Sequence, residues 1–251
     1  VIAMRDDAIQ PDVVVDVNRI PELRAVSQEN GRITIGAAVT FGEIATQPML
    51  LAQVPFLPQA ASQVGSPQIR GAGTVGGNIA SGSPAADCVV PLVALDADVL
   101  LASKAGQRVV PLAEVFRARP GEVNINKDEL IVSVSFATPP PGTRCSFVKL
   151  GRRNALSVAR LSCAVLGRLN GDGVVELAAV AIGAAAPHPF RATGLEQMLV
   201  GSRPLPQLLQ RVVDASSGEI ARVLGNRASM PYKREAIKGV IWEALEGCFV
   251  V

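Results

Sequence analysis

The sequence predicts an α+β protein that folds into two domains. Its 251 residues can bury two modest hydrophobic cores without disulfide support. Before residue 139, short segments with strand or helix character alternate, whereas after residue 142 the strands come first and the helices follow. Between these parts, the run Pro139-Pro140-Pro141-Gly142 cannot join the interior of a sheet or a helix, because proline lacks a backbone N–H group. We therefore expect one domain over residues 1–140 and a second over residues 141–251.

Strands and short helices make up the expected first domain. The β-branched run Val13-Val14-Val15 favours a buried strand within residues 11–17. Asn30-Gly31 favours a tight turn between two strands within residues 24–40, because both residues tolerate positive φ. The other elements follow from apolar spacing and from the turns that bound them: helices over residues 41–47 and 56–64, an ordered loop over 71–82, and strands over 98–102, 108–111 and 129–136.

The expected second domain has an antiparallel set of strands and closes with helices. Apolar runs predict strands over residues 146–150, 159–169 and 174–184, the last two joined by a turn at Asn170-Gly171-Asp172-Gly173. Two helices should follow, and the last is amphipathic because its apolar residues recur at helical spacing. These residues are Ile237, Val240, Ile241, Ala244, Leu245, Cys248 and Phe249. They should pack against the rest of the second domain.

Composition and charge argue against several classes of protein. The net charge is +2 and the basic residues are scattered, so nucleic acid is not an expected partner. Cys88, Cys145, Cys163 and Cys248 form no Cys-x-x-Cys pair, which argues against a zinc or iron-sulfur site and favours buried thiols in a cytoplasmic protein. The apolar runs fall short of the roughly 20 residues that a membrane helix needs, so no membrane span is expected.

The glycine-rich segment over residues 71–82 carries the candidate binding function. Its glycines would let the backbone approach a ligand and point successive N–H groups at one spot, as loops that hold phosphate do. Thr74, Asn78 and Ser81 add short hydrogen-bonding side chains. This combination favours a diphosphate, although on composition alone a glycine-rich turn without a ligand remains an alternative.

The same segment contains a pattern found in nicotinamide-nucleotide dehydrogenases of the Rossmann fold. Gly71, Gly73 and Gly76 match G-x-G-x-x-G, and Asp96 follows about twenty residues later. In a Rossmann fold, however, the pattern follows a buried strand and opens a helix, whereas here it follows the polar residues 60–70, which include Pro67. We therefore do not expect a Rossmann dehydrogenase.

Longer motifs are spread over nearly the whole chain. They are Ser66-Pro67-Gln68-Ile69-Arg70, Gly73-Thr74-Val75-Gly76-Gly77-Asn78-Ile79, Pro84 with Asp87, Lys149-Leu150-Gly151-Arg152-Arg153, residues 187–191 and Tyr232-Lys233. With this combination, the sequence resembles the FAD-binding (medium) subunits of molybdenum hydroxylases, which include nicotinate, xanthine and carbon monoxide dehydrogenases. The combination is far more specific than any single glycine pattern.

The resemblance implies both a fold and a set of cofactor-binding residues. The fold would be an FAD-binding domain of the vanillyl-alcohol-oxidase (PCMH) type, followed by a C-terminal domain of antiparallel sheet and helices like that of the carbon monoxide dehydrogenase flavoproteins. By motif position, the residues expected along the FAD diphosphate and ribityl chain are Thr74, Val75, Gly76, Gly77 and Asn78. Asp87 would accept hydrogen bonds from cofactor hydroxyls.

Three further positions are implied by the same match. Gly65 would border the flavin, Ile131 would pack on the cofactor and Lys149 would approach the ring system. A lysine is more often a solvated surface charge, but near a flavin it could stabilise the negative charge of the reduced form. Because Asp87 lies in a polar stretch of sequence, its replacement by alanine should lower flavin affinity and leave the fold intact.

One departure from the family concerns its first cofactor loop, of the type Ala-Gly-Gly-Thr-Asp-Leu. No such loop precedes Val1-Ile2-Ala3-Met4-Arg5 in this sequence. We therefore expect the chain by itself to bind FAD weakly.

The resemblance also implies a function and partners. The chain would be an oxidoreductase subunit that takes electrons from 2Fe-2S clusters in a small subunit and passes them through FAD to an acceptor such as NAD. A large molybdopterin subunit would oxidise the substrate, an N-heterocycle such as nicotinate or a purine. The alternative is a flavin-free assembly subunit of the same kind of complex. No nucleophile–base pair or carboxylate cluster stands out, and the only histidine, His188, is expected at a solvent-facing turn between two prolines.

Overall fold

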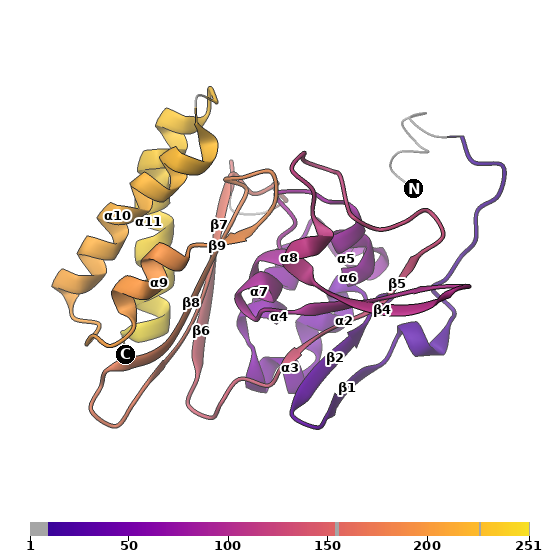
Figure 1. Cartoon of the computed structure of the whole chain (residues 1–251), viewed down its shortest axis with the longest axis horizontal. Coiled ribbons are helices and arrows are strands. Elements are labelled where there is room, and N and C mark those ends of the chain that lie inside the picture. The colour runs from indigo at the N-terminus through magenta and orange to yellow at the C-terminus, as the bar shows by residue number, and fades with distance from the viewer. Residues whose placement is uncertain (1–9, 154–155, 226, 251) are drawn as a thin grey trace.

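A computed structural model of the chain describes residues 10–153, 156–225 and 227–250. It contains two antiparallel sheets, with one group of helices between them and a second group on the outer face of the second sheet (Figure 1). Residues 1–9, which the sequence analysis compared with the family's first cofactor loop, lie outside the described residues. Among these residues, no helix is long and apolar enough to cross a membrane.

The first sheet has the strand order β1-β2-β5-β3-β4. Its strands are β1 (Val26–Glu29), β2 (Arg32–Gly36), β3 (Asp98–Ser103), β4 (Gly106–Pro111) and β5 (Leu130–Ala137). Asn30 and Gly31 form the turn between β1 and β2 with φ angles of 49° and 73°, so the predicted hairpin is confirmed. The predicted strands on either side of Lys104 and over residues 129–136 are also confirmed.

The first part of the chain is rich in short helices. They are the 3-10 helix η1 (Pro21–Leu23) and the α-helices α2 (Phe41–Thr46), α3 (Pro48–Gln53), α4 (Phe56–Ser62), α5 (Pro67–Ala72), α6 (Val75–Ala80), α7 (Val89–Ala94) and α8 (Leu112–Val115). Helices α2 and α4 confirm the prediction, whereas α3 was not predicted. The prediction of a loop over residues 71–82 is wrong, because the end of α5 and the whole of α6 lie there.

Side-chain caps explain why helices form in this glycine-rich stretch. The Ser66 hydroxyl accepts a hydrogen bond from the N–H of Ile69 at the start of α5. The Thr74 hydroxyl accepts one from the N–H of Gly77 at the start of α6. Such caps stabilise a helix by about 1 kcal/mol, enough to offset a glycine in a helix interior. Sequence reasoning gave weight to the glycines and missed the two caps.

The expected strand around Val13-Val14-Val15 does not form. These valines are 75%, 64% and 76% exposed, and residues 11–17 contain no strand. β-branched residues favour extended backbone, but a strand also needs a neighbour with which to exchange hydrogen bonds. The first sheet ends at β1, and no described segment pairs with the valine run.

The second sheet has the order β6-β7-β8-β9, with α9, α10 and α11 on one of its faces (Figure 1). Its elements are β6 (Arg144–Leu150), β7 (Leu161–Leu169), β8 (Val175–Gly183), β9 (Phe190–Arg191), α9 (Thr193–Leu199), α10 (Pro206–Leu224) and α11 (Met230–Phe249). The three predicted strands and the two closing helices are confirmed. All seven apolar residues predicted for the last helix are buried.

Both faces of the second sheet are buried. Along β7, Cys163 and Val165 belong to the core formed with α9–α11, whereas Ala164 and Leu166 belong to the core formed with the first part of the chain. The alternation explains why the strand is apolar throughout. Residues 138–143, with the three prolines, connect the two sheets. The division into domains at residues 140 and 141 remains a prediction.

Candidate functional site

Two cavities bring most of the predicted site residues together. A cavity of about 480 Å³, here called the lysine cavity, is lined by residues that include Gln63, Gly65, Pro67, Arg70, Lys149 and Arg153. A second cavity of about 290 Å³, the glycine cavity, is lined by residues that include Ala37, Thr74, Gly76, Gly77, Glu129 and Ile131. Helix α5 contributes to the first cavity and α6 to the second. The motif before Gly73 therefore lines the lysine cavity, and the motif after Gly73 lines the glycine cavity.

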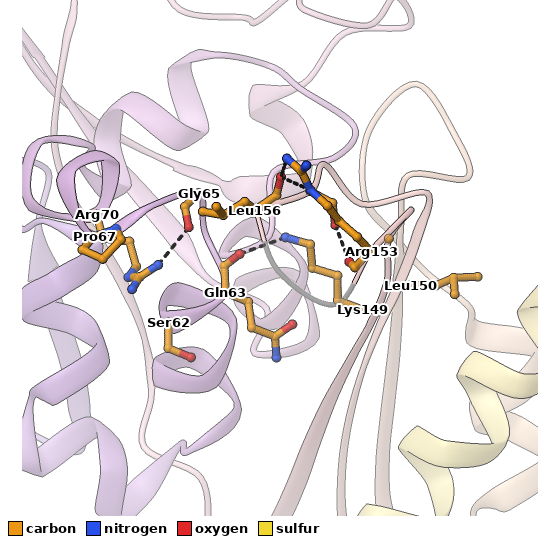
Figure 2. A pocket seen from close by; sticks show the side chains of 11 residues that line it. Ser62, Gln63, Gly65, Pro67, Arg70, Lys149, Leu150, Arg153 and Leu156 are labelled. Carbon is orange, nitrogen blue, oxygen red and sulfur yellow. Dashed lines mark hydrogen bonds between the residues drawn. The ribbon is translucent and has the colours of Figure 1, made fainter.

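An ion pair lies at the edge of the lysine cavity. The Lys149 Nζ atom, on β6, lies 2.6 Å from the Asp87 Oδ2 atom. It also donates a hydrogen bond to the Gln63 carbonyl at 3.0 Å, which Figure 2 shows. Both side chains are buried, with exposed fractions of 6% for Lys149 and 7% for Asp87. Burial raises the pKa of the Asp87 carboxyl, while the hydrogen bond and charge of Lys149 act in the opposite direction. A lysine buried in this way is not the solvated surface charge that the sequence alone favours.

The position of Asp87 corrects one expectation from the sequence. Asp87 lies two residues before the start of the buried helix α7 and carries a charge that Lys149 compensates. Removing one partner of a buried ion pair leaves the other charge without compensation, which is strongly destabilising. The expectation that an Asp87→Ala chain keeps its fold intact rests on a solvated loop that the structure does not contain.

The N–H groups of the glycine motif are not free to bind phosphate. They are already paired within the chain: Val75 with the Val39 carbonyl, Gly76 with the Ala37 carbonyl, Gly77 with the Thr74 hydroxyl and Asn78 with the Thr74 carbonyl. The interpretation that these successive N–H groups converge on a ligand is therefore wrong. The Val75 side chain is also fully buried in the core and presents nothing to either cavity.

Close packing explains two of the glycines, and an open cavity explains a third. A Cβ atom on Gly76 would lie 2.6 Å from the Ala37 Cβ atom, and one on Gly73 would lie 2.7 Å from the Phe41 ring. Gly77 differs, because the nearest atom to an added Cβ would be the Thr74 hydroxyl at 3.2 Å. Gly77 lines the glycine cavity, so it keeps that space open.

Two buried acceptors of the predicted cofactor set lack a partner among the described residues. The Asn78 Oδ1 and Asp87 Oδ1 atoms are buried and accept no hydrogen bond from any described residue. Buried oxygens without a donor cost free energy, so such atoms often mark the place of a ligand or water. Both belong to the predicted cofactor set, although neither residue lines the two cavities.

The structure also gives places to residues outside the predicted set. Arg70 lines the lysine cavity and donates to backbone carbonyls, and Glu129 lines the glycine cavity. Sequence reasoning quoted Arg70 only as part of a motif. The sequence did contain a signal for this role: Arg70 is a basic residue in the last turn of a capped helix, and such a side chain can bind nearby backbone carbonyls.

Other sequence interpretations are settled by geometry. His188 lies at a bend, as expected, but it is partly buried and stacks on Phe116, with ring centroids 5.7 Å apart, so it faces solvent less than expected. Asp96 pairs with Arg191, and no parallel strand pair exists among the described residues, which excludes a Rossmann site there. Within the described ranges, no group of three or more histidine, cysteine, aspartate or glutamate residues could hold a metal ion.

We expect Glu129 to make stability depend on pH in the acid range. Its hydrogen bonds with Arg108 and with the Asn126 N–H lower the pKa of the Glu129 carboxyl from 4.5 to about 2. Since the folded-state pKa is the lower one, this stabilisation is complete above pH 4.5 and is lost as the pH falls towards 2. Urea unfolding should show Glu129→Gln less stable than wild type at pH 6, and the difference should shrink at pH 3. A difference that does not change with pH would contradict this assignment.

Two family descriptions divide the chain between them. The FAD binding domain in molybdopterin dehydrogenase matches residues 1–139, and the CO dehydrogenase flavoprotein C-terminal domain matches residues 146–247. The nicotinate dehydrogenase FAD-subunit of Eubacterium barkeri is 32% identical, over 96% of this chain and 82% of that protein. The putative xanthine dehydrogenase FAD-binding subunit of Escherichia coli is 32% identical, over 92% of this chain and 81% of that protein.

Solved structures give the same result. A carbon monoxide dehydrogenase from Hydrogenophaga pseudoflava superimposes with a TM-score of 0.89 at 29% identity, covering 98% of this chain and 85% of the other. The quinoline 2-oxidoreductase of Pseudomonas putida, at 22% identity and a TM-score of 0.87, shares the fold. The first structure supports both the predicted order of domains and the fold class.

Proposed function

We propose that this chain, which belongs to the family of FAD-binding subunits of molybdenum hydroxylases, holds FAD along the lysine and glycine cavities and transfers electrons through it. The observation that carries the proposal is the buried Asp87–Lys149 pair, which lies at the edge of the lysine cavity and keeps one carboxylate oxygen without a donor. The free carboxylate oxygen of this buried pair can accept a hydrogen bond from a hydroxyl group of a bound ligand.

The residues present fit such a cofactor. The unpartnered Asn78 and Asp87 oxygens can accept hydrogen bonds from ribityl or ribose hydroxyls. Ile131 offers an apolar surface in the glycine cavity, and Gly77 leaves room beside it. Gly65 lines the lysine cavity without a side chain.

FAD supplies the redox chemistry, because it accepts electrons from one partner and delivers them to another. This chain contributes charged side chains around the cofactor. Lys149 holds a positive charge against the lysine cavity, and Asp87 keeps its ammonium group in place. A cation at this position favours negative charge on a neighbouring group, and the Asp87 carboxylate at 2.6 Å offsets part of that effect.

The partners are part of the same proposal. A small subunit with 2Fe-2S clusters would donate electrons, and a large molybdopterin subunit would oxidise an N-heterocycle such as nicotinate or a purine. NAD is the proposed acceptor. A cytoplasmic location is consistent with four cysteines that are all free in the structure.

Reconstitution tests the cofactor assignment. The full assembly, stripped of flavin and incubated with FAD, should bind one FAD per chain, and Asn78→Ala should weaken binding about tenfold through loss of a buried hydrogen bond. Asn170→Ala, in the turn between β7 and β8, is the matched control and should bind like wild type. Failure of the wild-type assembly to take up FAD would favour the flavin-free assembly subunit.

Reduction of the bound flavin tests the direction of electron flow. NADH should bleach the oxidised flavin spectrum of the isolated subunit at an FAD concentration that saturates its weak binding, because hydride transfer to NAD can run in reverse. The heterocyclic substrate should have no effect without the partner subunits. Bleaching by substrate alone would refute the electron-transfer proposal. Turnover of the assembly with a dye but no bleaching by NADH would refute only NAD as the acceptor.

A further inference from the structure

Three successive backbone carbonyls at one wall of the lysine cavity all bind cationic side chains. The Gln63 carbonyl accepts a hydrogen bond from the Lys149 Nζ atom at 3.0 Å. The Arg70 Nη1 atom donates to the Val64 carbonyl at 3.2 Å and to the Gly65 carbonyl at 2.9 Å. Figure 2 shows Arg70 and Lys149 reaching this segment from opposite sides. The segment over residues 63–65 is therefore fixed by two charges from different elements.

This segment is a turn that would otherwise be adjustable. It connects α4 to α5, and Gly65 adopts a φ of 44° in the left-handed region. A Cβ atom on Gly65 would lie 2.9 Å from the Ile69 side chain, so the turn also packs tightly against α5. Glycine has more backbone freedom than any other residue, and the position of its carbonyl depends on what binds it. Here that partner is Arg70.

We propose that Arg70 is a positioning residue for the cofactor site, because it fixes the Gly65 turn that forms a wall of the lysine cavity. This inference rests on the proposed function. Lys149 is tied to the same turn through Gln63, so a shift of the turn would also change the surroundings of the Lys149 ammonium group. Arg70 thus sets both the shape of the cavity wall and the place of its buried cation.

The chemistry of arginine suits this role. One guanidinium nitrogen reaches two carbonyls in the same turn, and the planar group loses little conformational freedom for each hydrogen bond it forms. Lysine at position 70 could place one ammonium group near the same carbonyls, with a poorer fit. Glutamine would keep a shorter, neutral donor and lose the charge.

The experiment compares Arg70→Gln, Arg70→Lys and the control Arg119→Gln, each in the full assembly. Arg119 carries the same charge on an exposed side chain that lines neither cavity. Three quantities are measured: the FAD dissociation constant, the visible circular dichroism of flavin at saturating FAD, and the unfolding temperature of the flavin-free protein. We expect Arg70→Gln to weaken FAD binding about tenfold, by loss of charge-assisted hydrogen bonds, and to change the flavin dichroism at full occupancy.

The conservative variant separates positioning from general stability. Arg70→Lys should recover part of the affinity and most of the flavin dichroism, and Arg119→Gln should match wild type in all three measurements. An unchanged dichroism at saturation in Arg70→Gln would overturn the proposal, as would affinity losses that follow only the unfolding temperature. If the wild-type assembly itself binds no FAD, the proposed function fails. If the wild-type assembly binds FAD but substitution of Arg70 changes neither the affinity nor the dichroism, only the role of Arg70 fails.

Discussion

Asp87→Ala is expected to lower the free energy of unfolding by about 3–5 kcal/mol, the usual cost of leaving a buried charge without its partner. Lys149 would keep its ammonium group in a site where only 6% of the side chain is exposed, and the Gln63 carbonyl alone cannot neutralise it. Urea denaturation of the flavin-free protein measures this loss directly. Flavin affinity should fall as well, because an acceptor for the cofactor is removed.

A double variant tests whether the buried pair is the cause. Replacing both partners, as Asp87→Leu with Lys149→Met, removes the uncompensated charge, so this protein should be more stable than either single variant. The exposed carboxylate Asp128 supplies the control, and Asp128→Ala should change stability by less than about 0.5 kcal/mol. If Asp87→Ala is as mild as Asp128→Ala, the ion pair does not hold this part of the fold.

Adjacent glycines in α6 should differ in how much stability they lose when a methyl group is added. Gly76→Ala is expected to cost about 1–3 kcal/mol, because its Cβ would lie 2.6 Å from one atom of Ala37 and 2.8 Å from the carbonyl oxygen of the same residue. Gly77→Ala should cost less than Gly76→Ala, because its Cβ would approach only the Thr74 hydroxyl, at 3.2 Å, and alanine is the better helix former.

FAD affinity should depend on the size of the side chain at position 77. Gly77 lines the glycine cavity, so the larger Gly77→Val should reduce FAD affinity more than Gly77→Ala does, and neither should unfold the protein. Thermal unfolding and FAD titration of all three variants provide the measurements. Equal affinities for wild type and Gly77→Val would show that the cofactor does not use this cavity.

Much of the fold could be predicted because its signals are local. The β1–β2 hairpin follows from two residues that tolerate positive φ, and the buried face of α11 follows from helical spacing alone. Strands β7 and β8 are apolar along their whole length and are joined by a turn rich in glycine and asparagine. The extended run at Val13–Val15 misled the prediction, since strand propensity says nothing about whether a partner strand is present.

The cofactor-binding roles of the candidate residues remain predictions, and their arrangement could not be predicted from the sequence. Gly65 and Lys149 do line one cavity, and Thr74, Gly76, Gly77 and Ile131 do line another. The sequence could not show that the motif divides between two cavities. It also could not show that the backbone N–H groups of residues 75–78 are already used, because their acceptors include Ala37 and Val39 on a distant part of the chain.

The sequence by itself determined the family, the order of strands and helices in the second part of the chain, and the residues that deserve testing. Only the tertiary structure decided which contacts those residues make. Asp87 and Lys149 are 62 positions apart and become an ion pair because β6 packs beside the helices of the first part. Gly76 is required by contact with Ala37 and Gly77 by an open cavity, although the two are neighbours in the chain. The physical reason is that propensity and spacing act between near neighbours, whereas burial, charge compensation and steric fit depend on residues that meet only when the chain has folded.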